Sequence, residues 1–213
     1  FTITKKCFRI KKYITEFLGT LILVLVIGLT GNPIFVGITI TAIVYIGIHI
    51  SGAHYNPAVS IAMLIRGLVN VKETIYYIFS QLLGAIVAAF IVFLIDEKSM
   101  IIEACKTASV AKVLLIEFIC TFLLIFIILF VATDKRTEGN YYYGLVIGFT
   151  VMFISYFGAG ISGGAYNPAV GAGPIIVDVI MGDGNSLSNL CYYIFGPIIG
   201  ALGASFMYQI TEQ

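Results

Sequence analysis

Long apolar segments separated by short polar links dominate this chain. A bilayer core of about 30 Å takes about 20 helical residues to cross. Six segments reach roughly that length: residues 13–30, 34–50, 74–95, 108–132, 141–160 and 189–210. Two more apolar pieces, 57–66 and 168–179, are too short to cross alone. The pattern predicts an all-α membrane protein with six transmembrane helices and two half-helices.

One motif occurs twice, just before each predicted half-helix. Residues 51–59 read SGAHYNPAV and residues 162–170 read SGGAYNPAV. The small residues allow irregular, extended backbone, Asn is a preferred N-cap, and Pro fits the first helical position. Each copy therefore predicts a stretch of irregular backbone that becomes a helix at Asn56-Pro57 or at Asn167-Pro168.

The repeat extends over the whole chain. Glu16-Phe17-Leu18-Gly19-Thr20 matches Glu117-Phe118-Ile119-Cys120-Thr121, and Tyr76-Tyr77-Ile78-Phe79 matches Tyr192-Tyr193-Ile194-Phe195. We therefore expect one domain, 1–213, built from repeats 1–100 and 101–213. Because each repeat holds an odd number of spans, the second is expected to be inverted in the membrane relative to the first.

Small residues recur at a spacing of four in two spans. They are Ser80, Gly84 and Ala88 in the third span, and Gly196, Gly200 and Ala204 in the sixth. This small-xxx-small pattern lets helix backbones approach closely in lipid. We expect both spans to pack tightly against neighbouring helices.

Composition agrees with a membrane protein and narrows the function classes. Of 213 residues, 60% are hydrophobic and 11% are charged, with a mean hydropathy of +1.04. The cysteines Cys7, Cys105, Cys120 and Cys191 lack metal-ligand spacing, and a disulfide framework is not expected. With no nucleophile-base arrangement and no phosphate-binding glycine loop, we predict no enzyme activity, no metal and no cofactor, and no nucleic-acid partner.

The distribution of Lys and Arg predicts the orientation. With the N-terminus inside, the inner side collects Lys5, Lys6, Arg9, Lys11, Lys12, Arg66, Lys72, Lys135 and Arg136, and the outer side has Lys98, Lys106 and Lys112. Both termini are then cytoplasmic, and the cell membrane is the expected location. Glu16 and the lack of a small-residue cleavage site favour a retained first span over a signal peptide, and the start at Phe1 leads us to expect a trimmed N-terminus.

Two irregular stretches that meet near mid-membrane predict a pore, because such backbone must be buried in protein or line a watery cavity. Asn56 and Asn167 would lie at its centre, at half-helix starts formed by Pro57 and Pro168. The positive helix ends and the amide N–H donors would repel cations and interrupt a proton wire. The expected lining carbonyls are those of Gly52, Ala53, His54, Tyr55, Gly163, Gly164, Ala165 and Tyr166.

Together these motifs resemble the aquaporin and aquaglyceroporin (major intrinsic protein) family of water and small-solute channels. The paired Ser-Gly-x-x-x-Asn-Pro-Ala motifs, the Glu-Phe-x-x-Thr pair, Gln81 and Gly196-Pro197 carry the resemblance over nearly the whole chain. It implies an aquaporin-like fold, a homotetramer with one pore per protomer, passive conduction, and a filter on the extracellular side of the asparagines.

The expected filter departs from the family. Alignment assigns it to Val36, Ser155, Gly164 and Val170, and the family nearly always has Arg at the place of Val170. A filter without aromatic ring, imidazole or cation is expected to be wide and apolar. We predict a channel for water and small neutral solutes such as glycerol or urea. A water-selective aquaporin and an ammonia or metalloid channel remain alternatives.

Several polar residues have both a structural and a functional interpretation. Glu16 and Glu117 are either an ion site or braces for the irregular backbone, and the resemblance favours braces. His54 is expected to orient its loop, and His49 is a candidate pH sensor. Tyr141, Tyr142 and Tyr143, together with Tyr76, Tyr77, Tyr192 and Tyr193, are predicted to form interfacial aromatic belts.

Two rival functions stay open. Secondary transporters also contain inverted repeats with broken helices, but they normally carry an ion-coupling group at mid-membrane, where this chain offers neutral asparagines. A silent structural or adhesion role, with a vestigial pore, is the other.

Overall fold

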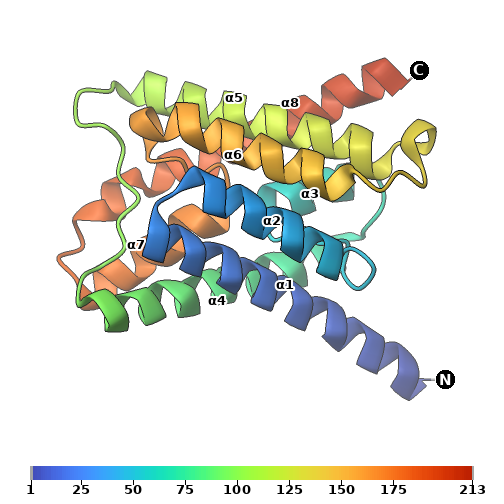
Figure 1. Ribbon diagram of the computed structural model, residues 1–213, viewed down its shortest axis with the longest axis horizontal. Coiled ribbons are helices and arrows are strands. Elements are labelled where there is room, and N and C mark those ends of the chain that lie inside the picture. Colours follow the sequence, from blue (N-terminus) through green and yellow to red (C-terminus); the bar gives the residue numbers. More distant parts are fainter. Residues whose placement is uncertain (1, 213) are drawn as a thin grey trace.

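The computed structural model describes residues 2–212, with side chains from Arg9 onward, as a bundle of helices (Figure 1). The side chains of Lys5, Lys6 and Cys7 lie outside this described part. The elements are α1 Thr2–Thr30, α2 Pro33–Gly47, α3 Pro57–Ile65, α4 Val71–Asp96, α5 Val110–Ile128, the π-helix η1 Leu129–Thr133, the 3-10 helix η2 Lys135–Thr137, α6 Tyr143–Ser162, α7 Pro168–Met181, the 3-10 helix η3 Asn185–Asn189 and α8 Leu190–Glu212.

Among the described residues, five helical stretches are long and apolar enough to cross a membrane. The remaining predicted span, α2, has 15 residues, which is about 22 Å of helix and shorter than expected. Its path continues as turns, because the backbone N–H groups of Ile48 and Gly52 still donate to carbonyls four residues earlier, at 3.0 and 3.1 Å. The second span thus passes directly into the first irregular loop.

The two halves pack their helices in the same way. α1 lies against α4 and α5 against α8, while α2 and α6 meet across the halves. A Cβ added to Gly84 would come within 3.2 Å of the Leu21 backbone nitrogen, and one added to Gly200 within 3.0 Å of the Phe122 nitrogen. The predicted close helix packing is confirmed at these two glycines, where the backbones leave no room for a side chain.

The short helices α3 and α7 lie at opposite ends of the bundle (Figure 1). α3 lies at the end where α1 begins and α8 ends, and α7 lies at the other end. Each packs mainly against the other half, α3 against α8 and α7 against α4. The two half-helices therefore enter the bundle from opposite ends and tie the halves together.

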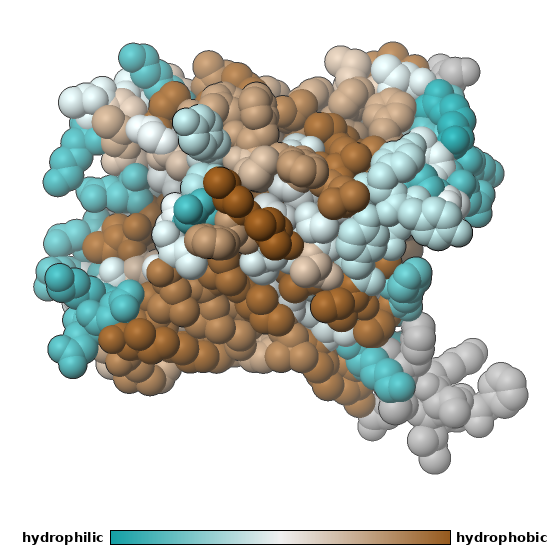
Figure 2. Space-filling model, viewed as in Figure 1, coloured by the Kyte–Doolittle hydropathy of each residue, from teal (hydrophilic) through white to brown (hydrophobic). Residues whose placement is uncertain are grey.

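A hydrophobic belt surrounds the middle of the molecule. Figure 2 shows brown, hydrophobic residues across the centre and teal, hydrophilic residues gathered towards the two ends. Large side chains such as Ile46, Phe79 and Phe206 are 70%, 64% and 64% exposed. Surface of this kind fits the hydrocarbon core of a bilayer, with the polar ends in the headgroup regions.

Candidate functional site

The two loops that precede α3 and α7 share an unusual backbone. Each contains three residues with a left-handed backbone conformation, instead of the simply extended stretch that we expected. They are Gly52 (φ 90°), Ala53 (φ 54°) and Tyr55 (φ 51°) in the first loop, and Gly163 (φ 84°), Gly164 (φ 80°) and Tyr166 (φ 48°) in the second. Non-glycine residues adopt such angles only where surrounding contacts hold them.

A buried carboxylate supplies those contacts in each half. Glu16 and Glu117 are both fully buried. Glu16 accepts hydrogen bonds from the backbone N–H of His54 at 3.0 Å and of Tyr55 at 2.7 Å. Glu117 accepts from the N–H groups of Ala165 and Tyr166, at 3.1 and 2.7 Å. Both carboxylates therefore satisfy loop donors that no helix or sheet could pair.

Tyr77 and Tyr193 hold the same loops from the opposite side. The Tyr77 hydroxyl donates to the Ser51 carbonyl, and the Tyr193 hydroxyl to the Ser162 carbonyl, both at 2.6 Å. Both rings are completely buried, so their assignment to interfacial belts was wrong. The hydroxyl of a buried tyrosine needs a partner, and here the serine carbonyl at the start of the loop provides it. The matching Tyr-Tyr-Ile-Phe repeats were a signal for this shared role.

The first half adds a polar cluster that the second lacks. The Gln81 amide donates to Glu16 at 2.8 Å and to the Ser60 hydroxyl at 2.9 Å. The Nδ1 atom of His54 lies 3.1 Å from the same hydroxyl. In the second half the corresponding residues are Ala165, Gly171 and Pro197. His54 therefore contacts its own loop and α3, as a loop-orienting role requires.

The two motif asparagines reach across to each other's loop. The amide nitrogen of Asn56 donates to the Tyr166 carbonyl at 3.0 Å, and that of Asn167 donates to the Tyr55 carbonyl at 2.9 Å. Each amide carries two N–H bonds, so this reciprocal contact engages one and leaves the other for a molecule in the cavity.

The same asparagines cap the half-helices. The side-chain oxygen of Asn56 accepts from the Ala58 backbone N–H at 2.8 Å, and that of Asn167 accepts from the Ala169 N–H at 2.9 Å. Proline follows at the first helical position in both cases. The positive ends of α3 and α7 consequently face the same central point, where they favour lone pairs over cations.

A cavity of about 380 Å³ passes this centre. All four residues of the predicted filter line it, namely Val36, Ser155, Gly164 and Val170, and so do both asparagines. A second cavity of about 620 Å³ lies on the other side of Val36, Ser155 and Gly164 and shares them as lining. The structure thus brings the predicted site residues together at the junction of two cavities.

The predicted carbonyl wall is divided between these cavities. We call the cavity of about 380 Å³ the inner cavity and that of about 620 Å³ the outer cavity. Gly163 borders only the outer cavity, whereas the other seven predicted residues line the inner cavity. The carbonyls of Tyr55 and Tyr166 already accept hydrogen bonds from the asparagines. The remaining inner wall is mainly aliphatic, with residues such as Leu23, Ile40 and Ile147. Within the described residues no cluster of three His, Cys, Asp or Glu side chains could hold a metal ion.

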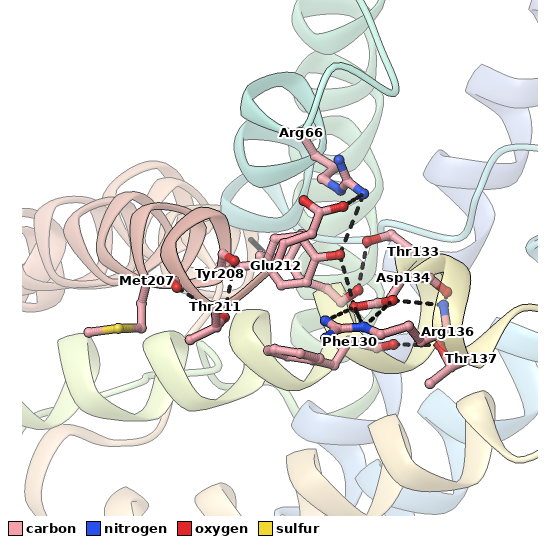
Figure 3. A network of polar contacts seen from close by, with 11 residues as sticks. Arg66, Phe130, Thr133, Asp134, Arg136, Thr137, Met207, Tyr208, Thr211 and Glu212 are labelled. Carbon is pink, nitrogen blue, oxygen red and sulfur yellow. Dashed lines mark hydrogen bonds and ion pairs between the residues drawn. The ribbon is translucent and has the colours of Figure 1, made fainter.

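A charged network lies at the end of the bundle that carries α3 (Figure 3). Arg66, at the end of α3, donates to Glu212 at 2.7 Å and to the Tyr208 hydroxyl at 3.4 Å. That hydroxyl donates to Asp134 at 3.2 Å, and Asp134 also accepts from Arg136 at 2.5 Å. The hydrogen bonds from Arg136 hold the pKa of Asp134 well below its usual range. The network therefore joins α3, α8 and the loop after α5.

The walls of the inner mouth are next to this network. We define the inner mouth as the cavity lining formed by Lys12, His49, Leu68, Val69 and Thr133. Thr133 precedes Asp134, and Leu68 lies two residues after Arg66. Sequence reasoning gave Lys12 a part in the orientation of the chain and none in the pore, because a lysine at the start of a span is ordinarily explained by orientation alone.

Comparison with known proteins gives relatives over nearly the full chain. The chain is 33% identical to Aquaporin NIP3-1 of Arabidopsis thaliana, covering 96% of this chain and 68% of that protein. It is also 33% identical to Glycerol uptake facilitator protein-like 6 of Lactiplantibacillus plantarum, covering 94% of this chain and 97% of that protein.

The fold has a solved counterpart, and a family model matches the sequence. The aquaglyceroporin from Plasmodium falciparum superposes with a TM-score of 0.79, at 22% identity and with 96% of both chains covered. The family model described as Major intrinsic protein matches residues 3–208. Together with the paired, inverted half-helices, this match means that the chain belongs to the major intrinsic protein family.

Proposed function

We propose that this chain forms a passive channel for water and small uncharged solutes such as glycerol and urea. One observation carries the proposal. The two cavities that meet at Val36, Ser155 and Gly164 lead past the paired asparagines, and this is the arrangement that a continuous passage requires. The names of the relatives, an aquaporin and a glycerol uptake facilitator, agree with it.

The chemistry of the lining favours neutral, hydrogen-bonding solutes. One wall carries loop backbone and the free N–H bonds of Asn56 and Asn167, and the facing wall is aliphatic. A polyol or an amide presents polar groups to the first wall and carbon to the second. The filter residues Val36, Ser155, Gly164 and Val170 include no charged group, which supports a wide, apolar constriction.

Exclusion of ions is assigned to the centre of the channel. The N-terminal ends of α3 and α7 converge there, each with a partial positive charge of about one half. A water molecule that accepts from the free N–H bonds of both asparagines must point its own hydrogens outward, which interrupts proton transfer along a chain of waters.

We further propose a homotetramer in the cell membrane, with both termini in the cytoplasm. The structural roles of Glu16, Glu117 and His54 belong to the same proposal. Those of the two carboxylates are supported by their hydrogen bonds to the loops, and that of His54 by the contact of its ring with Ser60 of α3. The inner end then carries Lys12, Arg66, Lys135 and Arg136, which agrees with the rule that cytoplasmic ends are rich in basic residues.

Stopped-flow swelling of vesicles that contain the protein tests the proposal. The solutes form a size-graded panel of water, ammonia, urea, glycerol and a neutral metalloid hydroxide. We expect water, urea and glycerol to pass with fluxes linear in the gradient. Passage of water alone would contradict the wide filter, and saturable or ion-coupled uptake would indicate a transporter. Absence of flux for every solute would indicate a structural or adhesion role with a vestigial pore.

A further inference from the structure

Among the described residues that line the inner cavity, one carries a full charge at neutral pH from a Lys, Arg, Asp or Glu side chain. It is Lys12, at the inner mouth. Val170 leaves the filter at the other end of the cavity without a cation. Within the inner cavity the fixed full charge therefore lies at the inner mouth and not at the filter, while the outer cavity has Asp96 and Lys98 in its lining.

The position of Lys12 is fixed by an ion pair between α1 and α4. Its ammonium nitrogen lies 2.7 Å from a carboxylate oxygen of Glu73, and the two side chains are 25% and 19% exposed. Glu73 belongs to the first turn of α4, and its backbone N–H donates to the capping oxygen of Asn70 at 3.0 Å. The N-terminal end of α4 carries a partial positive charge, which attracts this carboxylate.

The charges of Lys12 and Glu73 do not cancel at the position of a solute in the cavity. Lys12 lines the cavity and Glu73 does not, so the lysine side of the pair is next to the passage. The pair then acts as a dipole with its lysine end towards the passage. Loss of the ammonium alone would leave the negative charge of Glu73 behind the wall and reverse the sign of the field.

We propose that Lys12 is a specificity-determining residue of this channel, which together with Glu73 makes the field at the inner mouth positive and opposes the passage of cations. The inference rests on the proposed function, since it concerns discrimination by a conducting pore. It adds a second barrier to cations beside the helix ends at the centre, at a place where the sequence alone suggested none.

The test compares two probes of nearly equal shape, neutral urea and the guanidinium cation. Purified protein in vesicles at about pH 8, a pH above the ordinary pKa range of histidine side chains, gives the guanidinium-to-urea flux ratio. K12M is expected to raise this ratio about tenfold at low ionic strength and by less at higher salt, since screening weakens the effect. K12R is expected to keep the wild-type ratio.

A double variant separates charge from bulk. E73Q removes the negative charge of Glu73 and keeps the lysine, and it is expected to hold the ratio at or below the wild-type value. K12M/E73Q is neutral at the mouth, so its ratio is expected to lie between those of K12M and wild type. K135M, the same substitution at an exposed lysine that does not line the cavity, is the matched control and is expected to change nothing.

Distinct results would overturn the inference. They are an unchanged ratio in K12M, a ratio in K12M/E73Q equal to that in K12M, or a ratio that rises in E73Q. If wild-type vesicles pass water and exclude urea, the proton leak relative to water flow replaces the ratio, with the same expected order. Wild-type vesicles that pass no neutral solute would overturn the proposed function itself.

Discussion

The two halves of the molecule hold equivalent loops by different means. In the first half, four hydrogen bonds converge on Glu16, from Ser51, His54, Tyr55 and Gln81. In the second half, Glu117 accepts from the backbone N–H groups of Ala165 and Tyr166 and from the Ser162 side chain, and Pro197 at the place of Gln81 offers no fourth donor. Where the first half has a polar cluster, the second has close packing of small residues.

Gly171 illustrates the second solution. It occupies the place of Ser60, and a Cβ added there would lie 2.8 Å from Cγ of Tyr193. The backbone of α7 thus approaches α8 too closely for the hydroxyl that the first half uses. The comparison teaches that the repeat preserves the path of the backbone and the loop-bracing carboxylate, while the surrounding side chains can exchange hydrogen bonds for packing.

The largest expected difference between the halves concerns their carboxylates. E16A would leave four buried donors without their acceptor, against three for E117A, and each such donor costs about 1–3 kcal/mol. We expect E16A to lower the thermal midpoint in detergent more than E117A, or to prevent folding. Thermal aggregation followed by size-exclusion chromatography measures this. Equal midpoints would show that hydrogen-bond number does not distinguish the halves.

The halves are alike at the third residue after the asparagines, where Val59 and Val170 both line the cavity. V170R would make them differ. We expect it to lower glycerol and urea flux about tenfold, which corresponds to about 1.4 kcal/mol of added barrier, while water flow falls less. Stopped-flow swelling measures all three. V170M is the control for bulk without charge, and equal losses of water and glycerol in V170R would contradict a size effect at this position.

Substitutions at Gly171 and at Ser60 test how much close packing and hydrogen bonding each contribute to stability. G171A is expected to destabilise the second half by about 1–3 kcal/mol, since the new Cβ has no space beside Tyr193. S60A removes the partner of His54 and Gln81 and is expected to cost about 1–2 kcal/mol. Thermal midpoints of both variants, measured in the same detergent, give the order. A tolerated G171A would contradict the close approach.

The smallest expected effect is the pH dependence of the loop after η1. Asp134 belongs to the second half, and its pKa is lowered mainly by hydrogen bonds from Arg136. Such a carboxylate stabilises the folded state above its ordinary pKa, and the contribution is lost as pH falls towards the folded-state pKa. D134N should therefore lower the thermal midpoint at neutral pH, and its difference from wild type should shrink below about pH 4. A constant difference across pH would exclude the charge as the cause.

Much of the fold followed from the sequence because its signals are long and periodic. The span lengths, the repeat and the Asn-Pro helix starts depend on hydrophobic runs and capping chemistry that are local in the chain. The length of α2 did not follow, since turns that keep helical hydrogen bonds have the same hydropathy as a helix. The left-handed backbone at Tyr55 and Tyr166 was equally hidden, because tertiary contacts impose it.

The sequence indicated which residues gather at the candidate site, but not which hydrogen bonds they make there. The residues predicted for the filter and the two asparagines line one cavity, while the predicted carboxylates contact the loops beside it. The reciprocal bonds from Asn56 and Asn167 were missed, since they join residues more than a hundred positions apart. Tyr77 was assigned to an interfacial aromatic belt and Lys12 to the orientation of the chain, because tyrosine and lysine are common near the ends of spans for these reasons.

The reciprocal bonds between Asn56, Asn167 and the opposite loops have a consequence for ancestry. Neither repeat contains a complete set of partners for its own asparagine, so a polypeptide of half this length would acquire them only by associating with an upside-down copy of itself. An ancestor of that kind must have inserted in both directions, and fusion of two genes would have made the antiparallel pairing permanent.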